Sequence, residues 1–184
     1  MTYFVSLKIT AIIIGLLAIA GHLPGAIAPA KFGPMLKRWV RNYPLGVVLM
    51  LAATLWFTVL TGVMDLGEIS GARTQLMMVW AAAGVLVAIF VPGFLAVRGL
   101  GCLLLLGAAV VLDAAFLVDT PWRYVMTLLA YYWVIAGMVI VYSPHLGRDA
   151  VVYVTATPKR LSAFSWPGVI FGVVLIGLGL FVYP

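Results

Sequence analysis

The residues best suited to chemistry in this sequence are acids and arginines that gather around two short stretches. One is MDLGEISGAR, residues 64–73, and the other is DTPWR, residues 119–123. A further acid interrupts the apolar run just before the second stretch. Together they include four of the five acidic residues of the chain. The set consists of Asp65, Glu68, Arg73, Asp113, Asp119 and Arg123.

Asp113 is the strongest candidate because an acid inside an apolar helix is costly and defaults to a functional hypothesis. At 1.5 Å per residue it lies about 9 Å deeper than Asp119. A pocket with Asp113 at its base and Arg73 and Arg123 above it could bind an anion, and a second acid could complete an acid–base pair. The alternative is a structural ion pair, in which an arginine snorkels to Asp113. Both interpretations stay open.

The remaining chemistry-bearing residues point to no resident cofactor. His22 and His145 are the only histidines, and they are weak candidates for a metal or haem, because structural metal sites use more than two ligands. Cys102 is the only cysteine, which excludes paired-cysteine sites. The stretch GEISG lacks the spacing of a G-x-S-x-G nucleophile elbow. No P-loop, HExxH or dinucleotide fingerprint occurs.

The elements that carry these residues are predicted to be membrane-spanning helices. The chain is 65% hydrophobic and 9% charged, whereas soluble domains carry about 25% charged residues. Continuous apolar runs of about 20 residues favour helices over barrel strands. We therefore predict an all-α, polytopic integral membrane protein, a single domain over residues 1–184 with about six spans and short loops. The predicted spans are 3–21, 44–64, 74–91, 99–118, 123–142 and 164–183.

The prolines and glycines between the spans predict loops. The stretch GHLPGAIAPAKFGP is expected to be a loop followed by a short surface helix at residues 35–41, VPGF ends the third span, and SPHLGRD ends the fifth. The first span could instead be a signal peptide cleaved after APA. We expect a retained helix, since Lys8 follows an apolar start rather than a basic one.

The basic residues predict the orientation in a cell membrane, the inner or plasma membrane. Alternating loops place eight of the 11 on one side, and excess lysine and arginine marks the cytoplasmic side. Both termini, and the two charged stretches, are then outside. The eight are Lys31, Lys37, Arg38, Arg41, Arg98, Arg148, Lys159 and Arg160.

One face of the last predicted span is built for close helix packing. Ser165, Gly168, Gly172 and Gly179 recur at helical spacing and include a G-x-x-x-G motif. Small residues let helices approach closely in lipid. The sequence leaves open whether the neighbouring helix belongs to this chain or to another.

Three function classes remain, and the first is preferred. It is a non-catalytic subunit or scaffold of a membrane complex, which fits short loops, a glycine face and the lack of catalytic motifs. The second is a small transporter or channel using the polar set around Asp113. The third is a membrane enzyme acting on a lipid-linked substrate. The expected partners are membrane lipids and other membrane subunits or further copies of the chain. Nucleic acid is not expected, because the basic residues are scattered among apolar runs.

Overall fold

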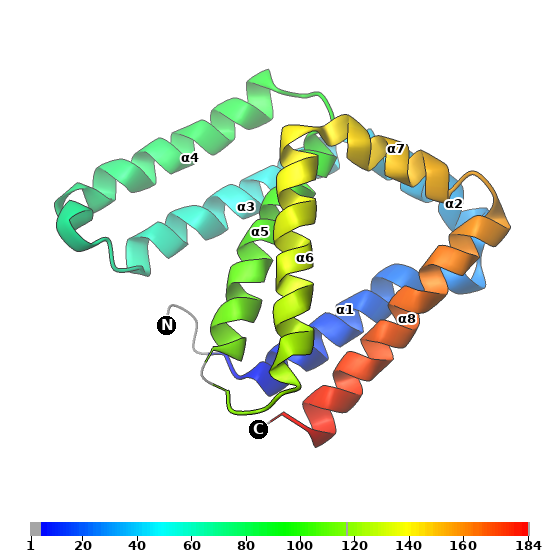
Figure 1. The fold of residues 1–184 in the computed structure, drawn as a ribbon. Helices are drawn as coiled ribbons and strands as arrows, with labels where there is room; N and C mark the ends of the chain where they lie inside the picture. Colours follow the sequence, from blue (N-terminus) through cyan, green and yellow to red (C-terminus); the bar gives the residue numbers. More distant parts are fainter. Residues whose placement is uncertain (1–4, 117, 184) are drawn as a thin grey trace.

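The chain folds as an all-α, polytopic helical membrane protein. The computed structural model describes residues 5–116 and 118–183, and in this part six helices are long and apolar enough to span a membrane (Figure 1). Two shorter helices, α2 and α7, and the 3-10 helix η1 complete the described structure. The long helices are α1 (Leu7–Ile27), α3 (Tyr43–Val63), α4 (Arg73–Phe90), α5 (Leu95–Ala115), α6 (Arg123–Tyr142) and α8 (Pro158–Phe181). The short ones are α2 (Pro29–Val40), η1 (Gly67–Ala72) and α7 (Pro144–Val154).

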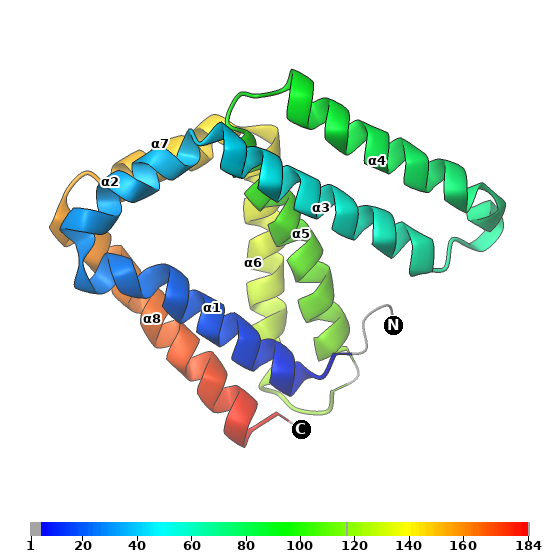
Figure 2. The same cartoon turned by 180° about the vertical axis from the view of Figure 1, so that it is seen from behind.

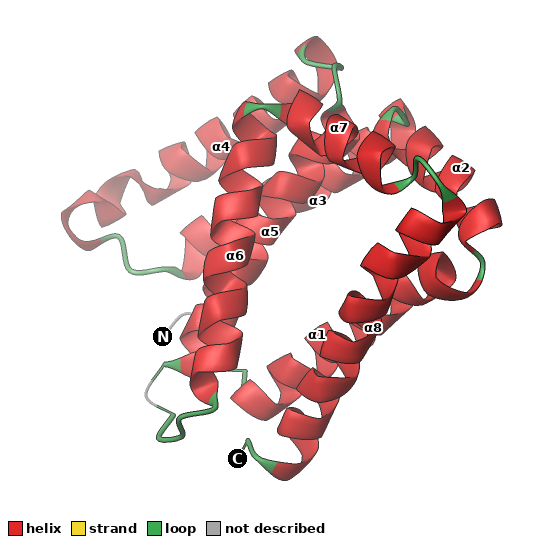
Figure 3. Cartoon of the chain, turned by 45° about the vertical axis from the view of Figure 1, so that its right-hand side comes forward, coloured by secondary structure: helices red, strands yellow, loops and turns green. Residues whose placement is uncertain are grey.

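The long helices pack as three pairs. Helix α1 lies along α8, α5 along α6, and α3 along α4, with α3 also packed on α5 (Figures 1 and 2). The α1–α8 and α5–α6 pairs meet at the end of the molecule where the chain termini lie, and they diverge towards the other end (Figure 3). There α2 and α7 lie side by side and bridge the two pairs. The α3–α4 hairpin joins the rest of the chain through α3.

Two clusters of buried side chains hold these pairs together. The larger one joins α1, α5, α6 and α8, and its most buried large residues include Leu7, Val111, Met126 and Leu175. The smaller one joins α3, α4 and α5 around Leu95. Val111 lies near the end of α5 and Leu95 at its start. Helix α5 therefore links all three pairs, through a different cluster at each end.

Glycines line the contacts between the paired helices. A Cβ atom added at Gly172 of α8 would lie 2.7 Å from the carbonyl oxygen of Gly15 in α1. One added at Gly137 of α6 would lie 2.9 Å from the carbonyl oxygen of Gly101 in α5. Such distances are too short for any side chain, so the α1–α8 pair and the α5–α6 pair each meet backbone to backbone.

The predicted packing face of the last span lies against α1 of the same chain, which resolves the choice of neighbour that the sequence left open. Gly179 faces Lys8 and Ile12, and Gly168 faces the ring of His22. Ser165 is buried opposite Gly25. The face therefore holds the first and last spans together.

The six predicted spans are confirmed, and so are the ends of the third and fifth spans at VPGF and SPHLGRD, since α4 ends at Phe90 and α6 at Tyr142. The predicted loop after the first span and the predicted starts of α2 and α8 were wrong. The predicted loop after the first span is helical: α1 continues through Pro24 to Ile27, and the surface helix begins at Pro29 rather than at residue 35. SPHLGRD opens α7 from Pro144, and α8 begins at Pro158 rather than at residue 164. Pro29, Pro144 and Pro158 each occupy the first position of a helix, where a missing N–H costs nothing. Residues 3 and 4 of the first predicted span, and residue 117 of the fourth, lie outside the described residues.

Candidate functional site: a basic groove between two short helices

The first half of the predicted polar set lies at the turn of the α3–α4 hairpin. The guanidinium of Arg73 donates hydrogen bonds to the carbonyl oxygens of Gly62 and Met64, the latter at 3.1 Å. These carbonyls belong to the C-terminal end of α3, where helix partners run out. A carboxylate oxygen of Asp65 accepts a hydrogen bond from the amide of Gly67 at 3.0 Å, and Glu68 is exposed. Arg73 and Asp65 therefore bind backbone and shape the turn.

The second half lies where α5 passes into α6. Arg123 donates a hydrogen bond to the carbonyl oxygen of Val118 at 3.0 Å, and its guanidinium lies 5.3 Å from the ring centre of Tyr124. Asp119 is exposed, and Asp113 is half-buried near the end of α5. Arg123 thus closes the loop that precedes its own helix.

The structure does not bring the two halves together. The turn containing η1 lies at the far end of the α3–α4 hairpin, well apart from the loop between α5 and α6 in both views (Figures 1 and 2). A single pocket over Asp113 would need Arg73 and Arg123 on the same side of it. A functional role for Asp113 stays a prediction. A site around Asp113 would not include the residues of η1.

The two histidines lie on separate elements. His22 is in α1, where its Nδ1 lies 2.8 Å from the carbonyl oxygen of Ala18 and its ring packs on Gly168 of α8. His145 is exposed in the first turn of α7. Within the described residues, no three histidine, cysteine or acidic side chains group as metal ligands do.

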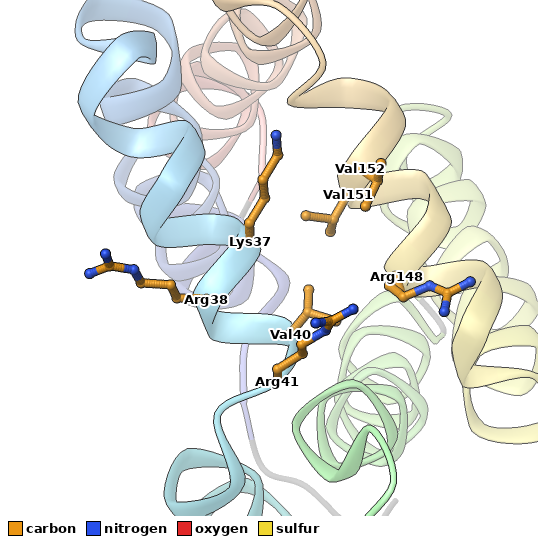
Figure 4. Close-up of a pocket in the computed structure, with 7 residues that line it drawn as sticks. All are labelled: Lys37, Arg38, Val40, Arg41, Arg148, Val151 and Val152. Atoms are coloured by element: carbon orange, nitrogen blue, oxygen red, sulfur yellow. The ribbon is translucent and has the colours of Figure 1, made fainter.

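A groove between α2 and α7 gathers basic side chains from two helices, and sequence reasoning missed it. Both helices are amphipathic, and they run side by side at the end where the helix pairs diverge. The groove between them has a volume of about 480 Å³, within the range of about 300–1,000 Å³ usual for small-molecule sites. Its lining consists of Lys37, Arg38, Val40, Arg41, Arg148, Val151 and Val152 (Figure 4).

The basic side chains of the groove differ in direction. Lys37 and Arg41 project from α2 into the space facing α7, whereas Arg38 projects away from it (Figure 4). Arg148 of α7 pairs with the neighbouring Asp149 at 2.6 Å and lies 5.5 Å from the ring centre of Phe94. Phe94 itself has a left-handed backbone, with φ of 54°, and directly precedes α5. Lys37 and Arg41 therefore extend into the groove, whereas Arg148 is held at its other side by Asp149 and Phe94.

The electrostatic balance of this groove is strongly positive. Four basic side chains line it, and one of them, Arg148, is paired with the carboxylate of Asp149. Lys37 also lines a neighbouring hollow of about 180 Å³ beside Thr155 and Thr157. Low-dielectric walls focus the field of such a cluster and attract anions. The arrangement is suited to binding an anion.

The fold and the groove define the class: a six-span helical membrane protein with a basic groove at one end. No protein-family model, curated protein or solved structure matches this chain.

Proposed function

We propose that this chain is a non-catalytic subunit or scaffold of a membrane complex, and that another membrane protein packs on its α3–α4 hairpin. The observation that carries the proposal is the unequal burial of the spans. Only 6% of the Gly67–Phe90 span is buried within the chain, against 39% for Leu95–Ala115. Helices in lipid are held by packing against other helices, and a second chain would supply the packing that α4 lacks.

The two helices of the hairpin pack closely on each other, and the hairpin projects from the rest of the molecule (Figures 1 and 2). The rings of Phe57 in α3 and Trp80 in α4 meet edge to face with centres 5.2 Å apart. Gly84 of α4 packs directly on Thr54, and the hydroxyl of Tyr43 donates to the carbonyl oxygen of Ala88 at 3.0 Å. The inner side of α4 is thus committed to α3. Its outer side is a preformed surface that costs little entropy to dock.

The outer side of α4 has the composition of a packing face. Gln75 is exposed in its first turn, and the small residue Ala82 lies between exposed larger ones, Met78 and Val85. A small residue among large ones forms a notch that a facing side chain can fill, and a polar group on a span favours hydrogen bonding to another helix. Both features favour a protein neighbour over lipid alone.

The transporter and enzyme alternatives receive less support. Each used the acids and arginines of both charged stretches as one site, and the structure holds these stretches apart (Figures 1 and 2). The backbone bonds of Arg73 and Arg123 also occupy the guanidiniums that would have held a substrate.

We further propose that the end containing α2 and α7 is cytoplasmic and that both termini are outside. The eight basic residues that predicted this orientation lie on α2, at its end, at the starts of α5 and α8, and on α7. Labelling with a membrane-impermeant maleimide tests it in a Cys102→Ser background. Ser70→Cys should react in intact cells, whereas Thr157→Cys should react only after lysis. The reverse pattern would invert the topology.

The subunit proposal is tested by native mass spectrometry of the chain after gentle extraction from its own membrane. We expect a second protein in fixed stoichiometry. Val79→Phe on α4 should release that protein, whereas the matched change Val173→Phe on α8 should not; the two valines are 56% and 57% exposed. A chain that is always found alone, or a partner released equally by both variants, would overturn the proposal.

A further inference from the structure

We propose that the groove between α2 and α7 binds the phosphate-bearing headgroup of an anionic phospholipid. This inference rests on the groove alone and is independent of the α3–α4 hairpin and of any partner subunit.

The charges of the groove select the chemistry of the ligand. Lys37 and Arg41 point into it from one helix, and Arg148 flanks it on the other (Figure 4). A lysine ammonium binds phosphate as a point charge and an arginine guanidinium binds it through two parallel hydrogen bonds. Asp149 is engaged by Arg148, which lowers its repulsion of an anion. A headgroup that carries a phosphate and no positively charged group therefore matches these residues best.

The position of the groove selects a lipid rather than a soluble anion. A single residue, Ala28, separates α1 from α2, and Ser143 alone separates α6 from α7. Both short helices therefore begin where a membrane-spanning helix ends, at the depth of the lipid headgroups. Amphipathic helices at this depth lie in the plane of the interface.

The apolar residues of the two helices complete the match to a lipid. Val40, Val151 and Val152 line the groove beside its cations, where a soluble phosphate would find no favourable contact. Met35 and Leu146 are also 65% and 47% exposed on the same two helices, and they can enter the acyl layer. The headgroup would bind the cations while the glycerol and first methylenes contact the valines.

The proposal is tested by titrating the purified, delipidated protein with phosphatidylglycerol or phosphatidylcholine and counting bound lipids by native mass spectrometry. Each basic residue near a membrane surface contributes about fivefold to binding of an anionic lipid. We expect phosphatidylglycerol to bind more tightly than phosphatidylcholine, and Lys37→Gln with Arg41→Gln to weaken it about 25-fold. Lys31→Gln is the matched control, because it removes one charge from the same helix at an exposed residue that does not line the groove. Lys37→Arg with Arg41→Lys should retain binding.

Three outcomes would overturn the proposal. Equal binding of both lipids would show that the groove does not recognise the anion. An equal loss in Lys31→Gln and in single Lys37→Gln would mean that the general charge of the surface is responsible. Displacement of phosphatidylglycerol by inorganic phosphate at equal concentration would make the ligand a soluble phosphate instead of a lipid. The melting temperature of each variant identifies any that fails to fold. If the glutamine double variant fails, the double variant Lys37→Arg with Arg41→Lys still tests the proposal, because it keeps both charges and should bind phosphatidylglycerol.

Discussion

The close contact of the first and last spans predicts that replacing two different glycines of α8 by alanine will change the stability of the protein by very different amounts. In α8, a Cβ at position 172 would lie 2.7 Å from the carbonyl oxygen of Gly15 and 2.7 Å from a side-chain carbon of Ile19 in α1. A Cβ at position 177 would have no neighbour within 4 Å. The change Gly172→Ala must therefore move two backbones apart, whereas Gly177→Ala fills open space.

The expected magnitude follows from the comparison of these two variants. Replacing a helical glycine by alanine favours the helix by about 0.5–1 kcal/mol, and this gain is common to both. Overpacking a well-packed contact costs about 1–3 kcal/mol, and this cost falls on Gly172→Ala alone. The difference between the variants is therefore about 1–3 kcal/mol. At about 2–4 °C per kcal/mol for a chain of this length, their melting temperatures should differ by roughly 2–12 °C.

The assay is thermal unfolding of both purified variants in the same detergent, followed by circular dichroism. Gly172→Ala should melt below Gly177→Ala, and Gly177→Ala at or above the unmodified protein. Equal melting temperatures would refute the reasoning, because α1 and α8 would then not meet backbone to backbone.

The other predictions concern single polar contacts. Tyr183→Phe removes the hydrogen bond that the tyrosine donates to the carbonyl oxygen of Trp122 at 2.8 Å and should cost about 1 kcal/mol in chemical unfolding; no loss would contradict this contact. Burial raises the pKa of Tyr183 above its ordinary value of 10.0, so its contribution to stability is complete below pH 10 and is lost as the pH rises through the raised pKa; the Phe variant should lack this part of the alkaline decline in melting temperature. Arg73→Gln should destabilise the α3–α4 turn by about 1.5–3 kcal/mol through its charged hydrogen bonds, seen as faster hydrogen exchange around η1. Asp149→Asn should change stability by less than about 1 kcal/mol, since its pair with Arg148 is solvent-exposed, and a larger loss would mean that the pair is screened from water.

The spans could be predicted from the sequence because their signal is compositional. Twenty apolar residues in a row have one stable arrangement in lipid, whatever their order. The helix starts at Pro29, Pro144 and Pro158 were missed because a proline ends one helix and begins another with the same residue type. A side-chain cap marks only the last of these starts, where the hydroxyl of Thr157 accepts a hydrogen bond from the amide of Arg160 at 3.2 Å. Ala28 and Ser143, which precede the other two, make no side-chain cap.

The candidate site could be predicted only in part. The basic residues were recognised, but as markers of orientation, since two helices separated by about a hundred residues must pair before Arg41 and Arg148 line one groove. The polar set around Asp113 was assembled from a shared side of the membrane. A shared side of the membrane fixes how deep a residue lies but not where it lies within the plane of the membrane. In the structure, the hairpin that carries Arg73 diverges from α5. The packing of α3 on α5, where Gly46 and Gly99 bring the two helices close together, decides that position.

The measurement that tests the central claim most directly is photo-crosslinking in the native membrane from the outer face of α4. A benzoylphenylalanine replaces Val85 there, and a second variant replaces Val173 on α8; both valines are exposed, at 45% and 57%. The subunit account predicts one discrete adduct with another membrane protein from position 85 and none from position 173. Adducts with lipid alone at both positions would contradict it, because α4 would then face the bilayer and not a partner.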